Sequence, residues 1–219
     1  MLAIADRAGF LGKTEPRSCM SVTTTILERT LVYRAWQAPF AGQKFAPVLQ
    51  RNDLRRVHRV LDVACGPGTN TRHFADVDYL GVDVNENYIR DARRKYGRDF
   101  LAVDARKLDN VGKEPFDFIL VNSFLHHLDT KDAFDVLSSL NLRLAPDGHI
   151  HILELVLPED RSIARLLARW DRGDFARPLP EWQTLFSKVF TQVLFEPYSI
   201  RAKGTVLWNM VYFKGKSKT

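Results

Sequence analysis

The sequence predicts an α/β fold built on a doubly wound, mainly parallel sheet. Three observations predict it: short apolar runs alternate with helical patterns, the first run breaks into a glycine-rich turn, and the second ends in a carboxylate about twenty residues later. This order of features is typical of a nucleotide-binding βαβ unit. A chain of 219 residues is long enough for one such domain with a sizeable core.

The first predicted strand covers residues 60–64 and runs into the glycine turn 65–68, which reads C-G-P-G. Glycine lets the backbone turn sharply and approach a ligand closely, because no Cβ stands in the way. A helix is expected to begin at Thr69 or Asn70, since both are good N-cap residues, and its free N–H groups would face the ligand. Cys65 fits a small buried side chain better than a reactive thiol.

The ligand predicted for this turn carries a ribose and a positive end. Asp83 ends the second predicted strand, residues 78–83, and a carboxylate accepts hydrogen bonds from both hydroxyls of a ribose. Gly66 and Gly68 are not followed by the third glycine of the dinucleotide fingerprint, which disfavours a dinucleotide oxidoreductase. Asp62, inside the first strand, would repel a pyrophosphate but would help to order a loop that holds an α-amino group.

Further elements follow in order along the chain. The pattern predicts a helix at 85–96, strands at 100–103 and 116–121, a helix at 132–144, a strand at 149–154, a helix at 185–188 and a closing hairpin of 189–198 with 205–213. Ahead of the first strand, residues 23–49 read as two helices divided near Pro39. After the fifth strand, an aromatic and arginine-rich stretch is too long for a plain connector.

Five separated stretches together resemble the class I S-adenosylmethionine-dependent methyltransferases. They read L-D-V-A-C-G-P-G-T, G-V-D, V-D-A, F-D-F-I-L-V-N-S-F-L-H-H-L and L-A-P-D-G-H-I-H-I-L-E, and they follow the family's order and spacing between residues 60 and 154. The resemblance implies a Rossmann-like sheet of seven strands in the order 3-2-1-4-5-7-6, with strand 7 antiparallel. It also implies one domain over 23–219, with cover helices at 23–52 and an acceptor-binding cap at 158–190.

The resemblance further implies S-adenosylmethionine as the cofactor, bound at the carboxyl ends of the strands. Asp83 would hold the ribose, Asp104 would accept a hydrogen bond from the exocyclic amine of adenine, and the backbone of Ala105 would border the ring. A cover helix would bring Tyr33, Gln43 or Lys44 to the methionine part. The full set of expected cofactor-binding residues is Asp62, Ala64, Gly66, Gly68, Asn70, Asp83, Val84, Asp104, Ala105, Asn122, Ser123 and Tyr33.

Two adjacent histidines follow the fourth predicted strand. His126 would take a proton from an acceptor hydroxyl as the methyl group arrives, while the alternative is that this L-H-H-L pattern packs structurally. His127 and Trp36 are expected to contact the acceptor. Base- and amide-methylating members of the family carry Asn/Asp-Pro-Pro-Tyr where residues 122–125 read N-S-F-L, which argues against a nucleic-acid substrate. No metal site is expected, because adjacent residues rarely ligate one ion.

The predicted cap is rich in arginine. Arg169, Arg172 or Arg177 is expected to clamp a carboxylate or phosphate of the acceptor, since a guanidinium group pairs with such groups in a bidentate way. Arg161, Arg165 and Arg169 form a basic stripe at helical spacing. This stripe is interpreted either as a solvated helix face or as an interfacial helix that lies on anionic lipid.

Composition limits the partners and the location. The net charge of +6 is spread along the chain without an aromatic-interleaved patch, so no nucleic-acid partner is expected. No apolar stretch approaches the roughly 20 residues that span a bilayer, although peripheral membrane contact stays open. The N-terminus lacks a secretory signal pattern, so we expect a cytoplasmic monomer or homodimer with a mobile leader at 1–22.

The predicted function is methyl transfer to oxygen, nitrogen or an activated carbon of a small molecule, with an acidic and a lipid-tailed acceptor both open. A sulfonium methyl group is already activated, so the enzyme mainly aligns the reacting atoms and excludes water. The alternative is a non-catalytic protein that binds S-adenosylmethionine or S-adenosylhomocysteine as a regulator or assembly partner, because the same binding residues serve both functions.

Overall fold

The computed structural model describes residues 38–108, 111–112, 114–170 and 174–218. The chain divides into two units, residues 1–41 and 42–219, and the second contains all the strands that the structure describes. The expected leader and the first expected cover helix lie outside the described residues.

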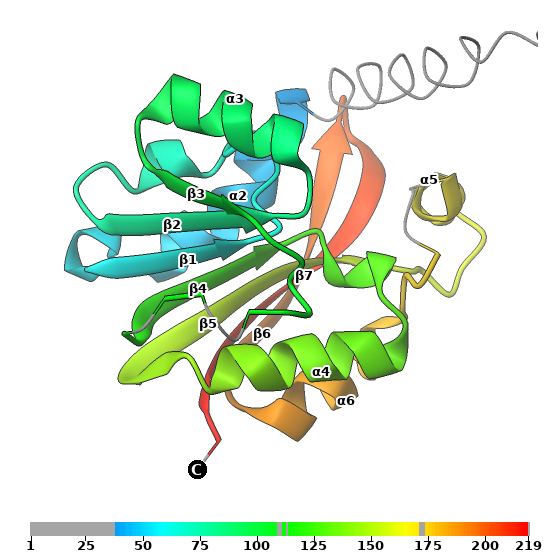
Figure 1. The fold of residues 1–219 in the computed structure, drawn as a ribbon. Coiled ribbons are helices and arrows are strands. Elements are labelled where there is room, and N and C mark those ends of the chain that lie inside the picture. The colour runs from blue at the N-terminus through cyan, green and yellow to red at the C-terminus, as the bar shows by residue number, and fades with distance from the viewer. Residues whose placement is uncertain (1–37, 109–110, 113, 171–173, 219) are drawn as a thin grey trace, which may run out of the picture. The chain divides into compact units, whose positions relative to one another are not determined.

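A seven-stranded sheet forms the centre of this unit, in the order β3-β2-β1-β4-β5-β7-β6 (Figure 1). Strands β1 to β5 pair in parallel, whereas β7 runs antiparallel to both β5 and β6. The strands are β1 (Arg59–Val63), β2 (Asp78–Asp83), β3 (Asp99–Ala102), β4 (Phe116–Asn122), β5 (Leu144–Val156), β6 (Phe190–Ala202) and β7 (Thr205–Ser217). The predicted fold class and strand order are confirmed.

Helices and short 3-10 turns precede the first strand and connect the later ones. The best-defined boundaries are those of α3, where the Asn85 side chain accepts from two N–H groups and Gly97 ends the helix in the left-handed conformation at φ 61°. The α-helices are α2 (Ala41–Arg51), α3 (Glu86–Tyr96), α4 (Thr130–Asn141), α5 (Ile163–Trp170) and α6 (Leu179–Val189), and the 3-10 turns are η1 (Ala38–Phe40), η2 (Leu54–Arg56), η3 (Thr71–His73) and η4 (Leu125–His127).

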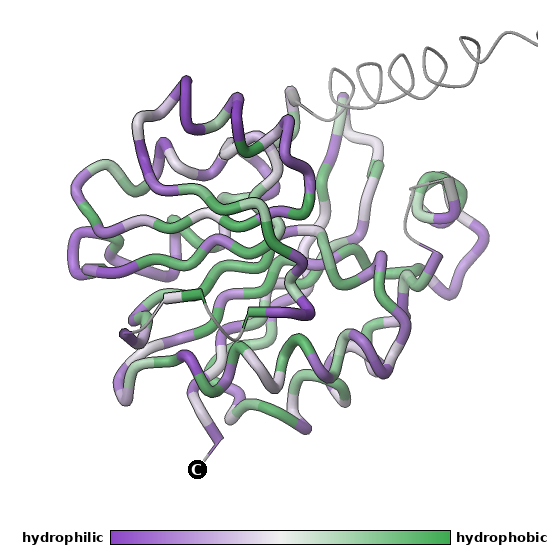
Figure 2. The backbone as a smooth tube through the Cα atoms, in the orientation of Figure 1, coloured by the Kyte–Doolittle hydropathy of each residue, from purple (hydrophilic) through white to green (hydrophobic). Residues whose placement is uncertain are grey.

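Two hydrophobic clusters cover the sheet. The larger joins the central strands to α4 and α6, with Trp182 fully buried and its indole N–H donating to the Leu155 carbonyl at 2.9 Å. The smaller includes Phe45 of α2 and Ile89 of α3. Figure 2 shows hydrophobic residues along the central strands and hydrophilic ones along α3. The helices therefore cover the faces of the sheet and leave its carboxyl edge to the loops.

One local prediction was wrong. No α-helix begins at Thr69 or Asn70, because the glycine turn is followed only by the single 3-10 turn η3. The side chain of Asn70 makes no capping hydrogen bond and donates instead to Asp62. The segment before β2 is also too short for a full α-helix and its connections. No helix N-terminus therefore faces the ligand at this turn.

The C-terminal half differs from its prediction mainly in length. Helix α6 begins at Leu179 rather than 185, and β5 begins at Leu144 rather than at His149. Residues 145–148, which separate the predicted helix from the predicted strand, fall in a register shift opposite Phe116 and Phe118 of β4, so that the strand includes them. Among the described residues, no helix is both long and apolar enough to cross a membrane.

Candidate functional site

A cleft of about 630 Å³ opens at the carboxyl ends of β1 to β4, within the size range of small-molecule sites. Ligands of open α/β sheets bind at this edge, where the strand order reverses. The cleft is lined by Ala64, Val82, Asp83, Val84, Val103, Asp104, Ala105, Arg106, Ser123, Phe124, His127, Leu128, Asp129, Asp132 and Phe175.

Strained backbone marks two walls of the cleft. Ala64 follows β1 with φ 54°, and Ser123 follows β4 with φ 56°. A side chain other than glycine in this region costs on the order of 1–3 kcal/mol and is found most often at functional sites. Both residues lie at strand ends beside the same cleft, which indicates that the backbone there is shaped for a ligand.

The carboxylate of Asp83 joins the glycine turn to the end of β2. One of its oxygens accepts from the Gly66 N–H and the other from the Asn85 N–H, each at 2.8 Å. A carboxylate has about four acceptor sites, so two remain for ligand hydroxyls. Gly66 has φ +55°, and a Cβ built on it would meet no atom within 4 Å, so the space beside this turn is open.

Asp104 lines the cleft one strand away, and Arg106 holds it. Nη2 of Arg106 lies 2.6 Å from Asp104, while Nη1 lies 3.1 Å from Asp132 of α4. Hydrogen bonds from the Arg106 side chain and backbone hold the pKa of Asp104 below its ordinary value. Asp104 is therefore a carboxylate at neutral pH, and a ligand amine would share it with Arg106.

A buried polar chain leads from β1 to the cleft. Asp62 accepts from the Tyr79 hydroxyl at 2.7 Å and from the Asn70 amide at 3.2 Å. Asn122 then donates to Asn70 at 3.3 Å, and the hydroxyl of Ser123, which lines the cleft, donates to Asn122 at 3.2 Å. The polar chain couples the interior of the sheet to the cleft wall.

Asp62 is an acid in an unfavourable environment. Its Oδ1 atom has no hydrogen-bond partner among the described residues. Burial and the charge of Asp83 raise the pKa of Asp62 to about 7, against the opposing effect of hydrogen bonds from Tyr79 and Asn70. Asp62 therefore titrates near neutral pH.

Glu154 is a second buried carboxylate and has many more donors. It accepts from the N–H groups of Phe124 and Leu125 at 2.7 and 2.6 Å, and it lies 2.7 Å from Nδ1 of His126. Burial raises the pKa of Glu154, but the charge and hydrogen bond of His126 and the backbone donors lower it more, so the net direction is downward. These bonds fix η4 beside the cleft.

Arg177 links the expected cap, residues 158–190, to the turn η4. Its guanidinium group donates to the carbonyl oxygens of Phe175 at 3.0 Å and Leu128 at 2.9 Å, and it lies over the Trp182 ring at 4.8 Å. The Phe175 N–H also donates to the His126 carbonyl at 3.0 Å. These contacts bring Phe175 to the cleft and engage Arg177 with the protein itself.

The expected site residues fall into three groups. Seven line the cleft: Ala64, Asp83, Val84, Asp104, Ala105, Ser123 and His127. The lining does not include Asp62, Gly66, Gly68, Asn70, Asn122, His126 and Arg177. Tyr33, Trp36 and Arg172 lie outside the described residues.

Burial changes the interpretation of His126 and Arg177. His126 is only 2% exposed and faces Glu154, and Arg177 is 6% exposed and donates to main-chain carbonyls. Neither faces the cleft, so their contacts favour structural roles over the expected proton transfer and acceptor binding.

Some cleft residues were not predicted from the sequence: Arg106, Phe124, Leu128, Asp129, Asp132 and Phe175. Asp129 carried a usable signal, because it precedes a helical pattern and accepts from the Asp132 N–H as the N-cap of α4. Phe175 carried none, because its position depends on long-range contacts with η4.

Residues 60–148 match a family model described as a methyltransferase domain. This part of the chain is therefore similar to methyltransferase domains. A trans-aconitate 2-methyltransferase of Rhizobium leguminosarum is 27% identical over 183 residues, which are 78% of this chain and 63% of that protein. A ubiquinone/menaquinone biosynthesis C-methyltransferase of Ectopseudomonas mendocina is 29% identical over 130 residues, 54% of this chain and 50% of that protein.

The methyltransferase fold also recurs among solved structures. The 1,6-didemethyltoxoflavin-N1-methyltransferase of Burkholderia thailandensis, solved with S-adenosylhomocysteine bound, has a TM-score of 0.64 at 21% identity, over 94% of each chain. The present chain spans between half and two thirds of the two curated relatives, so their alignments leave part of each relative unmatched.

The raised pKa of Asp62 predicts a pH-dependent stability. Native Asp62 keeps its proton up to about pH 7, whereas the unfolded residue releases it near its ordinary value, so this residue stabilises the fold at acidic pH and loses that contribution as the pH rises. Relative to Asp62→Asn, the free energy of unfolding of the wild type should fall by about 3 kcal/mol between pH 4 and pH 8. Urea unfolding of both proteins measures this, and parallel pH profiles would contradict it.

Glu154 should be far more important to the fold than a surface carboxylate. Glu154→Ala leaves buried N–H groups and His126 without their acceptor, so the free energy of unfolding should fall by about 3–5 kcal/mol. Glu196, which pairs with Arg51 at the surface, gives the matched control Glu196→Ala, for which little change is expected. Chemical unfolding compares the two, and similar losses would refute the role given to Glu154.

Proposed function

We propose that this protein transfers a methyl group from S-adenosylmethionine to a small-molecule acceptor. The observation that carries the proposal is the pair of carboxylates, Asp83 and Asp104, on adjacent strand ends of one cleft beside the strained Ala64. Separate acids suit separate groups of a nucleoside, a ribose diol and an exocyclic amine. The family and the curated relatives support methyl transfer as the reaction.

The residues of the cleft fit this cofactor. Asp83 has acceptor sites left for two hydroxyl groups, and Val84 is 72% exposed beside it, which provides an apolar surface for a planar ring. The acceptor oxygen of Asp62 that lacks a donor suits a positively charged end near the glycine turn. When bound, the sulfonium group supplies an activated methyl group, so the protein needs chiefly to position the acceptor and exclude water.

The η4 side of the cleft is the proposed acceptor side. Phe124, Leu128 and Phe175 give it an apolar lining, and His127 brings a titratable imidazole to it. We assign proton transfer, where an acceptor requires it, to His127 rather than to the buried His126. His126 is then a positioning residue, which acts through its bond to Glu154.

The lining favours a neutral, apolar acceptor over an acidic one. Among the described residues of the lining, Asp83, Asp104, Asp129 and Asp132 outnumber the one arginine, Arg106, which already pairs with two of them. A carboxylate entering this cleft would meet like charge. We therefore propose a lipid-tailed or otherwise apolar acceptor.

We also propose a cytoplasmic location, because the thiol of Cys65 is free and buried, which suits a reducing compartment.

Cofactor binding is tested at Asp83. Asp83→Ala removes the acceptor of the ribose hydroxyls, and the loss of two hydrogen bonds to a charged group should weaken binding of S-adenosylhomocysteine at least about a hundredfold. Isothermal titration calorimetry measures the change, with Asp91→Ala on the exposed face of α3 as the control. Unchanged affinity in Asp83→Ala, or equally tight binding of NAD by the wild type, would overturn the site.

Turnover separates an enzyme from a cofactor-binding regulator. The protein is incubated with methyl-labelled S-adenosylmethionine and cell extracts fractionated by polarity, and the label is expected in an organic-soluble product. Substitution of His127 by Asn should lower the rate, while cofactor affinity persists. Tight binding without a labelled product in any fraction would favour the regulator.

A further inference from the structure

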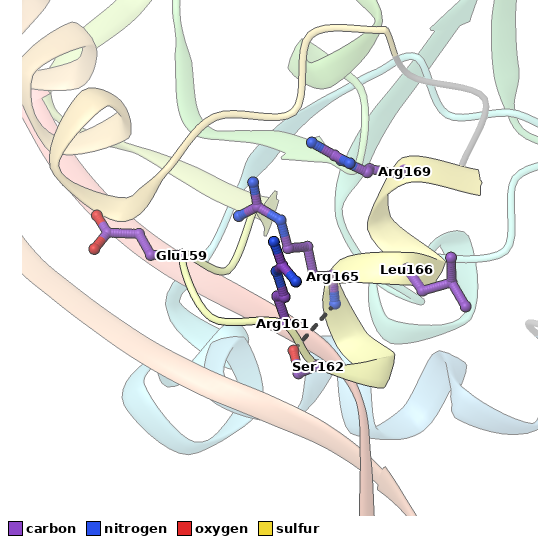
Figure 3. Close-up of a pocket in the computed structure, with 6 residues that line it drawn as sticks. All are labelled: Glu159, Arg161, Ser162, Arg165, Leu166 and Arg169. Atoms are coloured by element: carbon purple, nitrogen blue, oxygen red, sulfur yellow. Dashed lines mark hydrogen bonds between the residues drawn. The ribbon is translucent and has the colours of Figure 1, made fainter.

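Helix α5 packs on the outside of the sheet through small residues. Ala164 and Ala168 are each only 2% exposed, and the helix contacts β7. Ser162 caps it, since its hydroxyl accepts from the Arg165 N–H at 3.3 Å (Figure 3). The guanidinium group of Arg165 donates to the Pro158 carbonyl, which fixes this side chain beside the cap. The helix therefore packs on the sheet through its alanine side chains, and its larger side chains point in other directions.

Those larger side chains surround a hollow distinct from the cofactor cleft. It has a volume of about 590 Å³ and is lined by Glu159, Arg161, Ser162, Arg165, Leu166 and Arg169. In Figure 3 the arginine side chains lie along one side of the helix, and Leu166 lies on the other. Three arginines against one glutamate give the hollow a positive charge, which suits an anionic group.

The charge of the hollow is available for an outside partner. Within the part of the chain that the structure describes, Arg161 and Arg169 form no hydrogen bond or ion pair, and both are exposed. A guanidinium group has five donors and favours phosphate and carboxylate oxygens. A phosphate group in the hollow would give these arginines the acceptors that the described residues do not provide.

The same helix exposes aliphatic surface beside the arginines. Ile163 is 57% exposed and Leu166 is 49% exposed. Basic side chains next to exposed aliphatic ones are typical of a helix that lies in the interface of an anionic bilayer. A nucleic-acid surface instead combines arginine with aromatic side chains that stack on bases. The aliphatic side chains therefore favour a lipid surface.

We propose that α5 and the preceding residues 159–162 form a docking surface for an anionic membrane. Arg161, Arg165 and Arg169 bind lipid phosphate groups, while Ile163 and Leu166 enter the interface between headgroups and acyl chains. Contact of this kind is peripheral and reversible, because one short helix buries little apolar area and each basic residue adds about 1 kcal/mol. The inference rests on α5 and its hollow, and it does not depend on the proposed methyl transfer.

The test is vesicle co-sedimentation of the full chain, with phosphatidylcholine vesicles and with vesicles that also contain phosphatidylglycerol. The wild type should bind the mixed vesicles and leave the neutral ones unbound. The double variant R161Q/R169Q should bind the mixed vesicles roughly 30-fold less tightly, since two surface charges are lost. Leu166→Ser should also weaken binding, which purely electrostatic attraction would not produce.

Matched variants and competitors make the result decisive. R90Q/R94Q removes two charges from exposed positions of α3, and it should bind the mixed vesicles within about twofold of the wild type. Equal losses in the two double variants, or no binding of the wild type, would overturn the proposal. So would vesicle-independent binding of inorganic phosphate or a DNA duplex that R161Q/R169Q abolishes. Calorimetry with S-adenosylhomocysteine should give one affinity for all variants, which separates this test from that of the cleft.

Discussion

The buried carboxylate of Glu154 is the constraint on which the cleft depends. Carried by β5, it takes the N–H groups of Phe124 and Leu125 and the imidazole of His126, which η4 would otherwise leave unsatisfied in the core. Arg177 then binds the carbonyl side of the same turn. The donors and acceptors of one short turn are thus satisfied by two charged residues from distant parts of the chain, and the turn can present other side chains to the cleft.

Two buried acids in one sheet show how environment decides charge. Glu154 is surrounded by backbone N–H groups and a histidine, which together overcome the cost of burial and keep it ionised. Asp62 has two neutral donors and lies near Asp83, so burial dominates and its proton is held to about pH 7. Glu154 therefore acts as a fixed anion that organises a turn, whereas Asp62 can exchange a proton when a charged group approaches.

The sequence was sufficient for the sheet and for the cleft walls contributed by strand ends. Periodicity placed β2 at its observed bounds, and motif order placed Asp83 and Asp104 beside one cleft. It failed for the cap, because Phe175 reaches the cleft only through a long-range bond that no local pattern encodes. An acidic residue inside an apolar strand predicts a buried carboxyl group. This pattern identified Asp62, and the same pattern in β5 would have identified Glu154.

The shortness of the segment after the glycine turn limits what this cleft can become. Only η3 separates the turn from β2, so no row of aligned peptide dipoles stands behind it, and the local potential is set by the carboxylates of Asp62 and Asp83. Point substitutions in the turn cannot supply the missing dipoles. Conversion of this scaffold to a pyrophosphate binder would require an insertion long enough for two or three helical turns.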